Sequence, residues 1–333
     1  MALTQQQKEW LQSHPELKPR YSMKRRNEYH DYTSRCIYMI TLVVEGRHPL
    51  LGALCDRDAY HTSPWVNLTP LGKEVRRCWN EIPKHYPQVT PIRLQLMPDH
   101  MHGILFVTEK TPHHLGRIIN GFKIGCNKAL RELSPTMSPM TQTSQATHLW
   151  EEGYHDRILV GKDQLKRMID YLIDNPRRRL LKSSHPNLFK VHKMVTICNQ
   201  EMSAMGNIFL LNQPSIVAVK CSRSLVGEKL DKETHRLISL AQQGAILISP
   251  CISDGEKHVF RIAHEMGYST IVILAHSLKP LWKPGGKLFD ACAQGKLLLI
   301  SPWQQHDEPK KLTKEICNQL NTIATCIANV TFK

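Results

Sequence analysis

The stretch "MPDHMHGILFV" (residues 97–107) places two histidines at the start of an apolar run. If this run is a β-strand, His100 and His102 point to one face of a sheet, because side chains two residues apart share a face. Met101, Leu105 and Val107 then point to the other face, where they can pack. Two neighbouring imidazoles can hold one metal ion. Two partly exposed histidines near a turn, without a metal, can have the same spacing. The rest of the chain must therefore decide between these two interpretations.

The apolar spacing around this stretch predicts an α+β domain. Strands are expected over 35–44, 92–97, 101–108 and 149–160, and helices over 69–86, 114–133 and 162–176. This order is typical of a ferredoxin-like antiparallel sheet with helices on one face. Pro176 is expected to end the last helix. The Ser-, Thr- and Pro-rich segment 134–147 is expected to be a mobile loop.

The pattern changes in the second part of the chain. Short apolar runs at 215–220, 245–249, 269–275 and 296–301 alternate with helical segments. This alternation predicts a parallel sheet with βαβ crossovers, an α/β Rossmann-like fold. We therefore predict a basic N-terminal arm (1–30), the α+β domain (31–190), a linker (191–206) and the Rossmann-like domain (207–333).

Composition indicates a globular protein of ordinary size. The chain has 333 residues, of which 41% are hydrophobic and 22% charged, enough for two domains. No apolar run approaches the roughly 20 residues of a membrane helix, and the start is too polar for a signal peptide. We therefore expect a cytoplasmic, nucleoid-associated protein with no membrane partner. The ten cysteines form no CxxC pair, so most are expected to be reduced and buried.

The charge of the chain favours a polyanionic partner. The formal net charge is +15, and residues 1–200 hold 29 Lys and Arg against 18 Asp and Glu. Residues 201–333 hold only 15 against 11. A basic first part most simply indicates nucleic acid.

The predicted helix 162–176 carries a second pair of polar groups. Tyr171 and Asn175 are four residues apart, so they lie on the same face of the helix. They flank an apolar stripe of Leu165, Met168, Ile169 and Leu172. A tyrosine hydroxyl is a competent nucleophile, and a metal held by two histidines and an amide oxygen would polarise a phosphoryl group. A tyrosine that only packs between helix and sheet would fit the same spacing.

Four segments together resemble the REP-associated tyrosine transposases, which are single-tyrosine HUH nucleases. They are "LQLMPDHMHGILFV", "IINGFKIGCNKAL", "LWEEGYHDRILV" and "MIDYLIDNPRRR", and the resemblance runs over roughly residues 20–190. It implies that Tyr171 is the catalytic nucleophile and that His100, His102 and Asn175 are the metal ligands. It further implies Mg²⁺ or Mn²⁺ as the cofactor, and manganese suits a site that mixes imidazole and oxygen ligands.

Several basic residues are candidates for contacts with DNA. They are Lys123, which matches a position of the family, Arg177, Arg178 and Arg179 after the tyrosine, and Lys24, Arg25 and Arg26 in the arm. Basic residues also suit the solvated end of a helix, and a basic tail explains the arm equally well.

The second domain is loosely similar to the Rossmann-like domain of DNA-processing protein A. The resemblance rests on "SIVAVKCSRS" and "GAILISPCISDGEKHVFRIAHEMGYSTIVILA". It predicts an anion-binding edge where strands end and helices begin. However, Cys221 stands where a glycine is expected and Gly255 alone remains of the second Gly-rich loop. A structural or protein-binding appendage is the alternative.

These features predict an HUH transposase or endonuclease that cleaves and rejoins single-stranded, hairpin-associated DNA through a 5′-phosphotyrosine. One alternative is a non-catalytic DNA-binding regulator that retains the HUH fold, and another is a structural metal protein. The partner is expected to be single-stranded or hairpin DNA, and a homodimer is left open.

Overall fold

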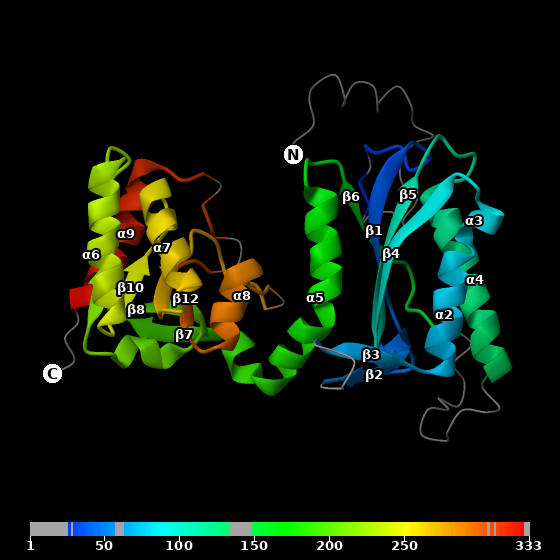
Figure 1. Cartoon of the computed structure of the whole chain (residues 1–333), viewed down its shortest axis with the longest axis horizontal. Coiled ribbons are helices and arrows are strands. Elements are labelled where there is room, and N and C mark those ends of the chain that lie inside the picture. Colours follow the sequence, from blue (N-terminus) through cyan, green and yellow to red (C-terminus); the bar gives the residue numbers. More distant parts are fainter. Residues whose placement is uncertain are drawn as a thin grey trace. The chain divides into compact units, whose positions relative to one another are not determined.

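The computed structural model describes residues 26–27, 29–56, 63–133, 148–280, 282–304, 307–309 and 311–329. The chain forms two compact units, Met1–Leu180 and Leu181–Lys333, each with its own sheet (Figure 1). The predicted fold class is confirmed: an antiparallel sheet domain precedes an α/β domain. The segment 134–147 and nearly all of the arm lie outside the described residues.

The sheet of the first unit has four antiparallel strands. They are β1 (Cys36–Val43), β4 (Val89–Met97), β5 (His100–Val107) and β6 (His155–Leu159), in the order β4-β5-β1-β6. This is the strand order of a ferredoxin-like fold. Only Pro98 and Asp99 separate β4 from β5, as the predicted hairpin requires. β5 is an interior strand, so β1 and β4 fix the register of its two histidines.

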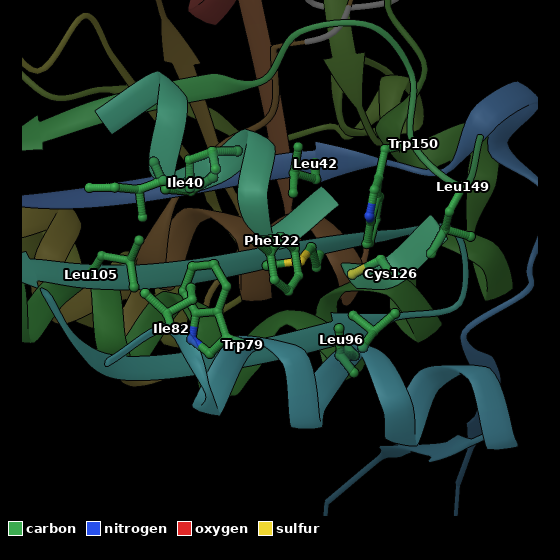
Figure 2. Packing of buried hydrophobic residues seen from close by; sticks show 14 of the residues in the cluster. Ile40, Leu42, Trp79, Ile82, Leu96, Leu105, Phe122, Cys126, Leu149 and Trp150 are labelled. Atoms are coloured by element: carbon green, nitrogen blue, oxygen red, sulfur yellow. The ribbon is translucent and has the colours of Figure 1, made fainter. Parts of the chain in front are cut away.

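One face of this sheet is covered by α2 (Pro70–Asn80), α3 (Ile82–His85) and α4 (Leu115–Leu133). Thr69 caps α2 by accepting a hydrogen bond from the Gly72 amide at 3.0 Å, as its sequence suggested. Trp79 of α2 lies directly over β5, where Gly103 makes room: a Cβ at that position would be 2.3 Å from the indole ring. Figure 2 shows Trp79 and Phe122 packed together in this core. A short hairpin, β2 (Gly52–Cys55) and β3 (Trp65–Leu68), adjoins this layer.

The opposite face is covered by α5 (Gln164–Ser184), so the prediction that all helices lie on one face is wrong (Figure 1). The predicted apolar stripe of α5 packs on the β5 side chain of Ile104 and on its neighbours in β1 and β6. Pro176 does not end this helix, which runs two further turns. Pro176 has no N–H to donate to the Leu172 carbonyl, so one helical hydrogen bond is lost. Packing of the buried proline ring stabilises the helix in spite of this loss.

The sheet of the second unit has six strands in the order β7-β8-β12-β11-β10-β9. β9 (Ile216–Ala218), β10 (Ile246–Ser249), β11 (Thr270–Ile273) and β12 (Leu297–Ser301) are parallel, as predicted. α6 (Glu228–Gln242), α7 (Asp254–Glu265) and α8 (Gly286–Ala293) pack on one face and α9 (Lys314–Asn329) on the other.

The predicted linker 191–206 is instead part of this sheet. β7 (His192–Ile197) and β8 (Gln200–Gly206) form a hairpin, and β8 pairs antiparallel with β12. The hairpin turns through Cys198 and Asn199, both with positive φ of 50° and 60°. Two consecutive residues with positive φ suit a tight hairpin turn. Asparagine tolerates a positive φ, whereas cysteine seldom adopts one. The turn therefore lacks the glycine that would have revealed it.

The cysteines are mostly reduced, as expected, although only three of the eight free ones are buried. Cys198 and Cys326 form a disulfide that joins the β7–β8 turn to α9. Among the described helices, none has the length and apolar character needed to cross a bilayer.

Candidate active site

The two histidines of β5 lie together on the face that α5 covers. Their ring centroids are 5.1 Å apart, and the His102 ring lies 5.9 Å from the ring of Tyr171. His102 is buried and His100 is largely so, whereas Tyr171 is 37% exposed. Tyr171 is therefore partly open to solvent, while the imidazoles are held in the sheet.

Both histidines are anchored through Nδ1. The His100 Nδ1 lies 2.7 Å from Oδ1 of Asp99, and the His102 Nδ1 lies 2.8 Å from Oγ1 of Thr41. A carboxylate that accepts from Nδ1 fixes the imidazole tautomer with its lone pair on Nε2 and makes that nitrogen a better ligand. A metal bound by this pair would accordingly be bound through the Nε2 atoms.

Asp99 is a site residue that sequence spacing did not single out. Its side chain is 7% exposed and contacts His100, Arg47 at 3.5 Å and Arg179 at 3.8 Å. The hydrogen bond with His100, together with the charge of Arg179, lowers the pKa of the carboxyl to about 2 against the effect of burial. Asp99 is thus ionised near neutrality. The signal for it was its place directly before His100.

α5 runs beside the start of β5 in the opposite direction. Tyr171 lies near His102 at one end, and Arg179 lies near Asp99 at the other. Eight helical residues rise by about 12 Å, and three strand residues span about 10 Å, so the two contacts are mutually consistent. Asn175 lies midway between Tyr171 and Arg179 on the same helix face. This puts Asn175 on the stretch of α5 that runs past the histidine pair.

The Asn175 side chain carries an unmet polar atom. The residue is 7% exposed, and its Nδ2 has no hydrogen-bond partner in the structure. Leaving a buried polar group unpaired is costly, so such a group calls for a ligand. The amide can turn about its last bond to present Oδ1 instead, and two imidazoles with an amide oxygen fit a divalent metal ion. No group of three or more His, Cys, Asp or Glu side chains suited to a metal occurs among the described residues.

A row of polar side chains crosses the sheet at His102. Gln95 of β4, Thr41 of β1 and His155 of β6 follow one another in register with it. Residues in register point to the same face. His155 is exposed and was also missed, because its partner in the row is set by strand pairing rather than by sequence spacing.

The predicted DNA-contacting residues divide into two groups. Arg178 and Arg179 lie at the site: the Arg178 guanidinium is 5.9 Å from the Tyr171 ring centroid. Arg177 instead makes two hydrogen bonds to Asp174, at 2.5 and 3.1 Å. Lys24 and Arg25 lie outside the described residues.

Lys123 and Arg26 do not lie at this site. Lys123 belongs to α4, on the other face of the sheet, and its ammonium donates to the carbonyls of Glu151 and Gly153 at 2.7 and 2.6 Å. The Arg26 guanidinium is largely buried, 3.6 Å from the Tyr154 ring centroid and 3.8 Å from the Asp156 carboxylate. Burial lowers the pKa of both groups. Both side chains thus make contacts within the first unit that stabilise its fold.

Several amides at the start of α7, where the sequence predicted an anion-binding edge, are already paired. The carboxylate of Glu256 accepts hydrogen bonds from the amides of Ile252 and Ser253, and the Ser253 hydroxyl caps the Glu256 amide. These three amides are therefore not open to a phosphate. The four parallel strands also follow one another in chain order, so they contain no point where the order reverses.

Comparisons with known proteins give distant matches. No protein-family model matches the chain. An uncharacterized protein of Haemophilus influenzae is 23% identical over 171 residues, 45% of this chain and 86% of that protein. A REP-associated tyrosine transposase bound to a REP hairpin is similar over 45% of this chain and 72% of its own, with 13% identity and a TM-score of 0.31. DNA processing protein A of Streptococcus pneumoniae is similar over 47% and 58%, with 17% identity and a TM-score of 0.33.

Proposed function

We propose that the first unit is a metal-dependent single-strand DNA endonuclease and strand transferase of the HUH tyrosine type. The observation that carries the proposal is the meeting of four groups from two elements. The ring centroids of His100 and His102 lie 5.1 Å apart, the Tyr171 ring lies 5.9 Å from that of His102, and the buried Asn175 lies one helical turn beyond Tyr171. The resemblance of the quoted motifs to REP-associated transposases points to the same four residues.

The residues would share the work as follows. Tyr171 Oη attacks the phosphorus of a phosphodiester, forming a tyrosine–phosphate bond as the bond to the 3′ oxygen breaks. The strand leaves with a 3′-hydroxyl, and the 5′ end stays on the protein. Attack by another 3′-hydroxyl reverses the step and joins strands without external energy. When bound by His100, His102 and Asn175, a divalent ion would stabilise charge on the phosphoryl oxygens.

Charge near the nucleophile supports a phosphodiester substrate. Arg178 is 5.9 Å from the Tyr171 ring centroid, and Arg179 lies one turn beyond Asn175 on the same face. A guanidinium at this place favours a bound phosphate. Residues 1–200 carry more Lys and Arg than Asp and Glu, which favours binding of a longer nucleic-acid strand.

The test uses a hairpin with a single-stranded flank, labelled at its 3′ end, with the full chain and Mn²⁺. A 5′-phosphotyrosine retains the 3′ label on the protein, so a labelled band of protein size is expected. Tyr171→Phe should abolish that band. Tyr154→Phe is the control, because Tyr154 packs under Arg26 with the core on the other sheet face.

Three results would contradict the proposal. An adduct in Tyr171→Phe would place the nucleophile elsewhere. Cleavage that persists in the presence of a chelator would show that the reaction needs no metal ion. Tight hairpin binding without any adduct in the wild-type chain would favour the alternative of a DNA-binding regulator.

A further inference from the structure

The edge strand β6 presents two basic side chains to the face of the sheet that α5 covers. β6 is the last strand in the order of its sheet, and its side chains alternate between the two faces. Asp156 points to the side of the main core, where its carboxylate accepts a hydrogen bond from the Tyr32 hydroxyl at 2.8 Å. His155 and Arg157, on either side of Asp156 in the chain, therefore point to the face under α5.

Strand pairing places both side chains beside the histidine–tyrosine site. His155 and His102 both pair with Thr41, so their Cα atoms are two strand spacings, or about 10 Å, apart. Arg157 pairs with Met39, which belongs to the apolar cluster on which α5 packs. The two basic side chains thus border the site along its β6 edge.

The Arg157 guanidinium lies against α5, next to the proposed nucleophile. Its Nη1 lies 3.7 Å from the sulfur of Met168. Met168 and Tyr171 are three residues apart in the helix, so their Cβ atoms are about 5–6 Å apart on its surface. A thioether is only a weak acceptor, so this contact holds the guanidinium in place while its strong donors stay available.

Neither side chain is neutralised by the protein. His155 and Arg157 are both exposed, and within the described ranges no carboxylate pairs with either of them. Arg177 of α5, by contrast, is held by Asp174. A guanidinium fork matches the oxygens of a phosphate, and an imidazole N–H can donate to a further oxygen. An anionic ligand with several oxygens suits this edge.

A second arginine lies further along α5. The Arg178 guanidinium is 5.9 Å from the Tyr171 ring centroid. Along the helix, Tyr171 therefore lies between the turn that contacts Arg157 and the turn that carries Arg178. A single strand whose scissile phosphate lies at Tyr171 would pass one arginine on each side, and its neighbouring phosphates are the anions closest to them.

We infer that Arg157 and His155 form a phosphate subsite, which holds a phosphate next to the scissile one in a single strand of DNA. The inference rests on the proposed function, since it takes Tyr171 as the place of the scissile phosphate. Arg157 donates its guanidinium fork to the phosphate oxygens, and His155 adds an imidazole N–H. Both are positioning residues, which hold the strand so that the scissile phosphate faces Tyr171.

The experiment measures DNA binding by the full chain that carries Tyr171→Phe, so that no strand is cut. Fluorescence anisotropy follows a labelled hairpin with a single-stranded flank, in which one phosphate at a time is replaced by an uncharged methylphosphonate. At one position of the flank the replacement should weaken binding about tenfold, the scale of a hydrogen bond to a charged group. With Arg157→Met added, the same replacement should change nothing.

Arg157→Met retains an apolar side chain against Met168, so the fold should persist in circular dichroism. It should also lower the dependence of log affinity on log salt by about 0.7, the value for one phosphate of a single strand. His155→Ala should reduce the effect of the same replacement about threefold. Arg131→Gln is the control and should retain the whole effect, because Arg131 is an exposed residue of α4 on the opposite side of the sheet.

Two results would overturn the subsite. One is a methylphosphonate scan that is the same with and without Arg157→Met. The other is a slower adduct formation in Arg157→Met, with Tyr171 in place, while the scan and the salt dependence stay unchanged, which would assign Arg157 to packing against α5. A failure of the proposed function looks different: no adduct forms in the wild type, although one phosphate still depends on Arg157.

Discussion

At the scale of single residues, Asp99 connects His100, a proposed metal ligand, to two arginines. Its carboxylate lies 2.7 Å from the His100 Nδ1 and also meets two arginines. Groups that orient a metal-bound histidine are commonly worth 10- to 100-fold in metal affinity. Asp99 therefore offers a test of the metal site that leaves all three proposed ligands in place.

We predict that Asp99→Asn binds Mn²⁺ about 10- to 100-fold more weakly than the wild type, measured by titration calorimetry. The amide retains the shape of the side chain but loses its charge, so the fold should persist in circular dichroism. Asp170→Asn is the matched control, because Asp170 is an exposed carboxylate of α5 paired only with Lys166. Equal affinities of Asp99→Asn and wild type would remove Asp99 from the site.

We predict that substitution of Lys123 lowers stability, whereas substitution of Arg178 lowers DNA affinity. Lys123→Met leaves two carbonyls without their donor, so the free energy of unfolding should fall by about 1–3 kcal/mol. The DNA affinity of the Lys123→Met variant should depend on salt as that of the wild type does. Lys128→Met is the control and should change neither quantity, since Lys128 is exposed. Chemical denaturation measures the first quantity.

Arg178→Gln should show the opposite pattern, with DNA affinity lowered and its dependence on log salt reduced by about one. The reason is its place beside Tyr171, where a phosphate would lie. Filter binding of a hairpin at several salt concentrations measures this slope. A wild-type slope in Arg178→Gln would show that the guanidinium makes no phosphate contact.

At the scale of elements, α5 positions Tyr171, the proposed nucleophile. Leu172 is fully buried between α5 and the sheet, directly after Tyr171. The helix is held there by a small apolar cluster, separate from the main core on the other face. The precision of the site therefore depends on few contacts, and a loss of one of them should affect both stability and rate.

We predict that Leu172→Ala lowers the free energy of unfolding by about 2–5 kcal/mol. It should also slow adduct formation strongly, because a shift of about 1 Å in a reacting group can cost 100-fold. Ile173→Ala is the neighbouring control: Ile173 is 52% exposed, so its loss should change stability by no more than about 0.5 kcal/mol. Wild-type adduct rates in Leu172→Ala would contradict the positioning role of α5.

At the scale of the whole molecule, the second unit begins earlier than its parallel strands. β8 covers the edge of β12, where Leu298, Leu299 and Ile300 are fully buried. Phe189 of the short 3₁₀ helix before β7 stacks on Phe289, with ring centroids 4.7 Å apart. The residues before 207 are therefore part of its core.

We predict that a fragment of residues 181–333 folds, while residues 207–333 do not. The shorter fragment exposes an apolar strand edge, which invites aggregation. Size-exclusion chromatography and thermal unfolding compare the two, and a single cooperative transition is expected only for 181–333. A monomeric, cooperatively folded 207–333 would show that the β7–β8 hairpin is dispensable.

Local spacing in the sequence determined much of this protein. Alternation placed the two histidines on one face of a strand, and helical spacing put Tyr171 and Asn175 on one face of a helix. The four apolar runs after residue 214 became the four parallel strands. These features depend on periods of two and 3.6 residues, which neighbours along the chain decide.

Tertiary structure alone decided which of these faces meet. Sequence spacing does not say on which side of the sheet α5 packs, so it could not show that the sheet separates Lys123 from the histidine–tyrosine site. The contacts of Asp99 with Arg47 and Arg179 join residues far apart in the chain. The β7–β8 hairpin was hidden because its positive-φ turn uses Cys198 and Asn199 without glycine. Burial and pairing across the chain stabilise these arrangements, and neither has a local signal in the sequence.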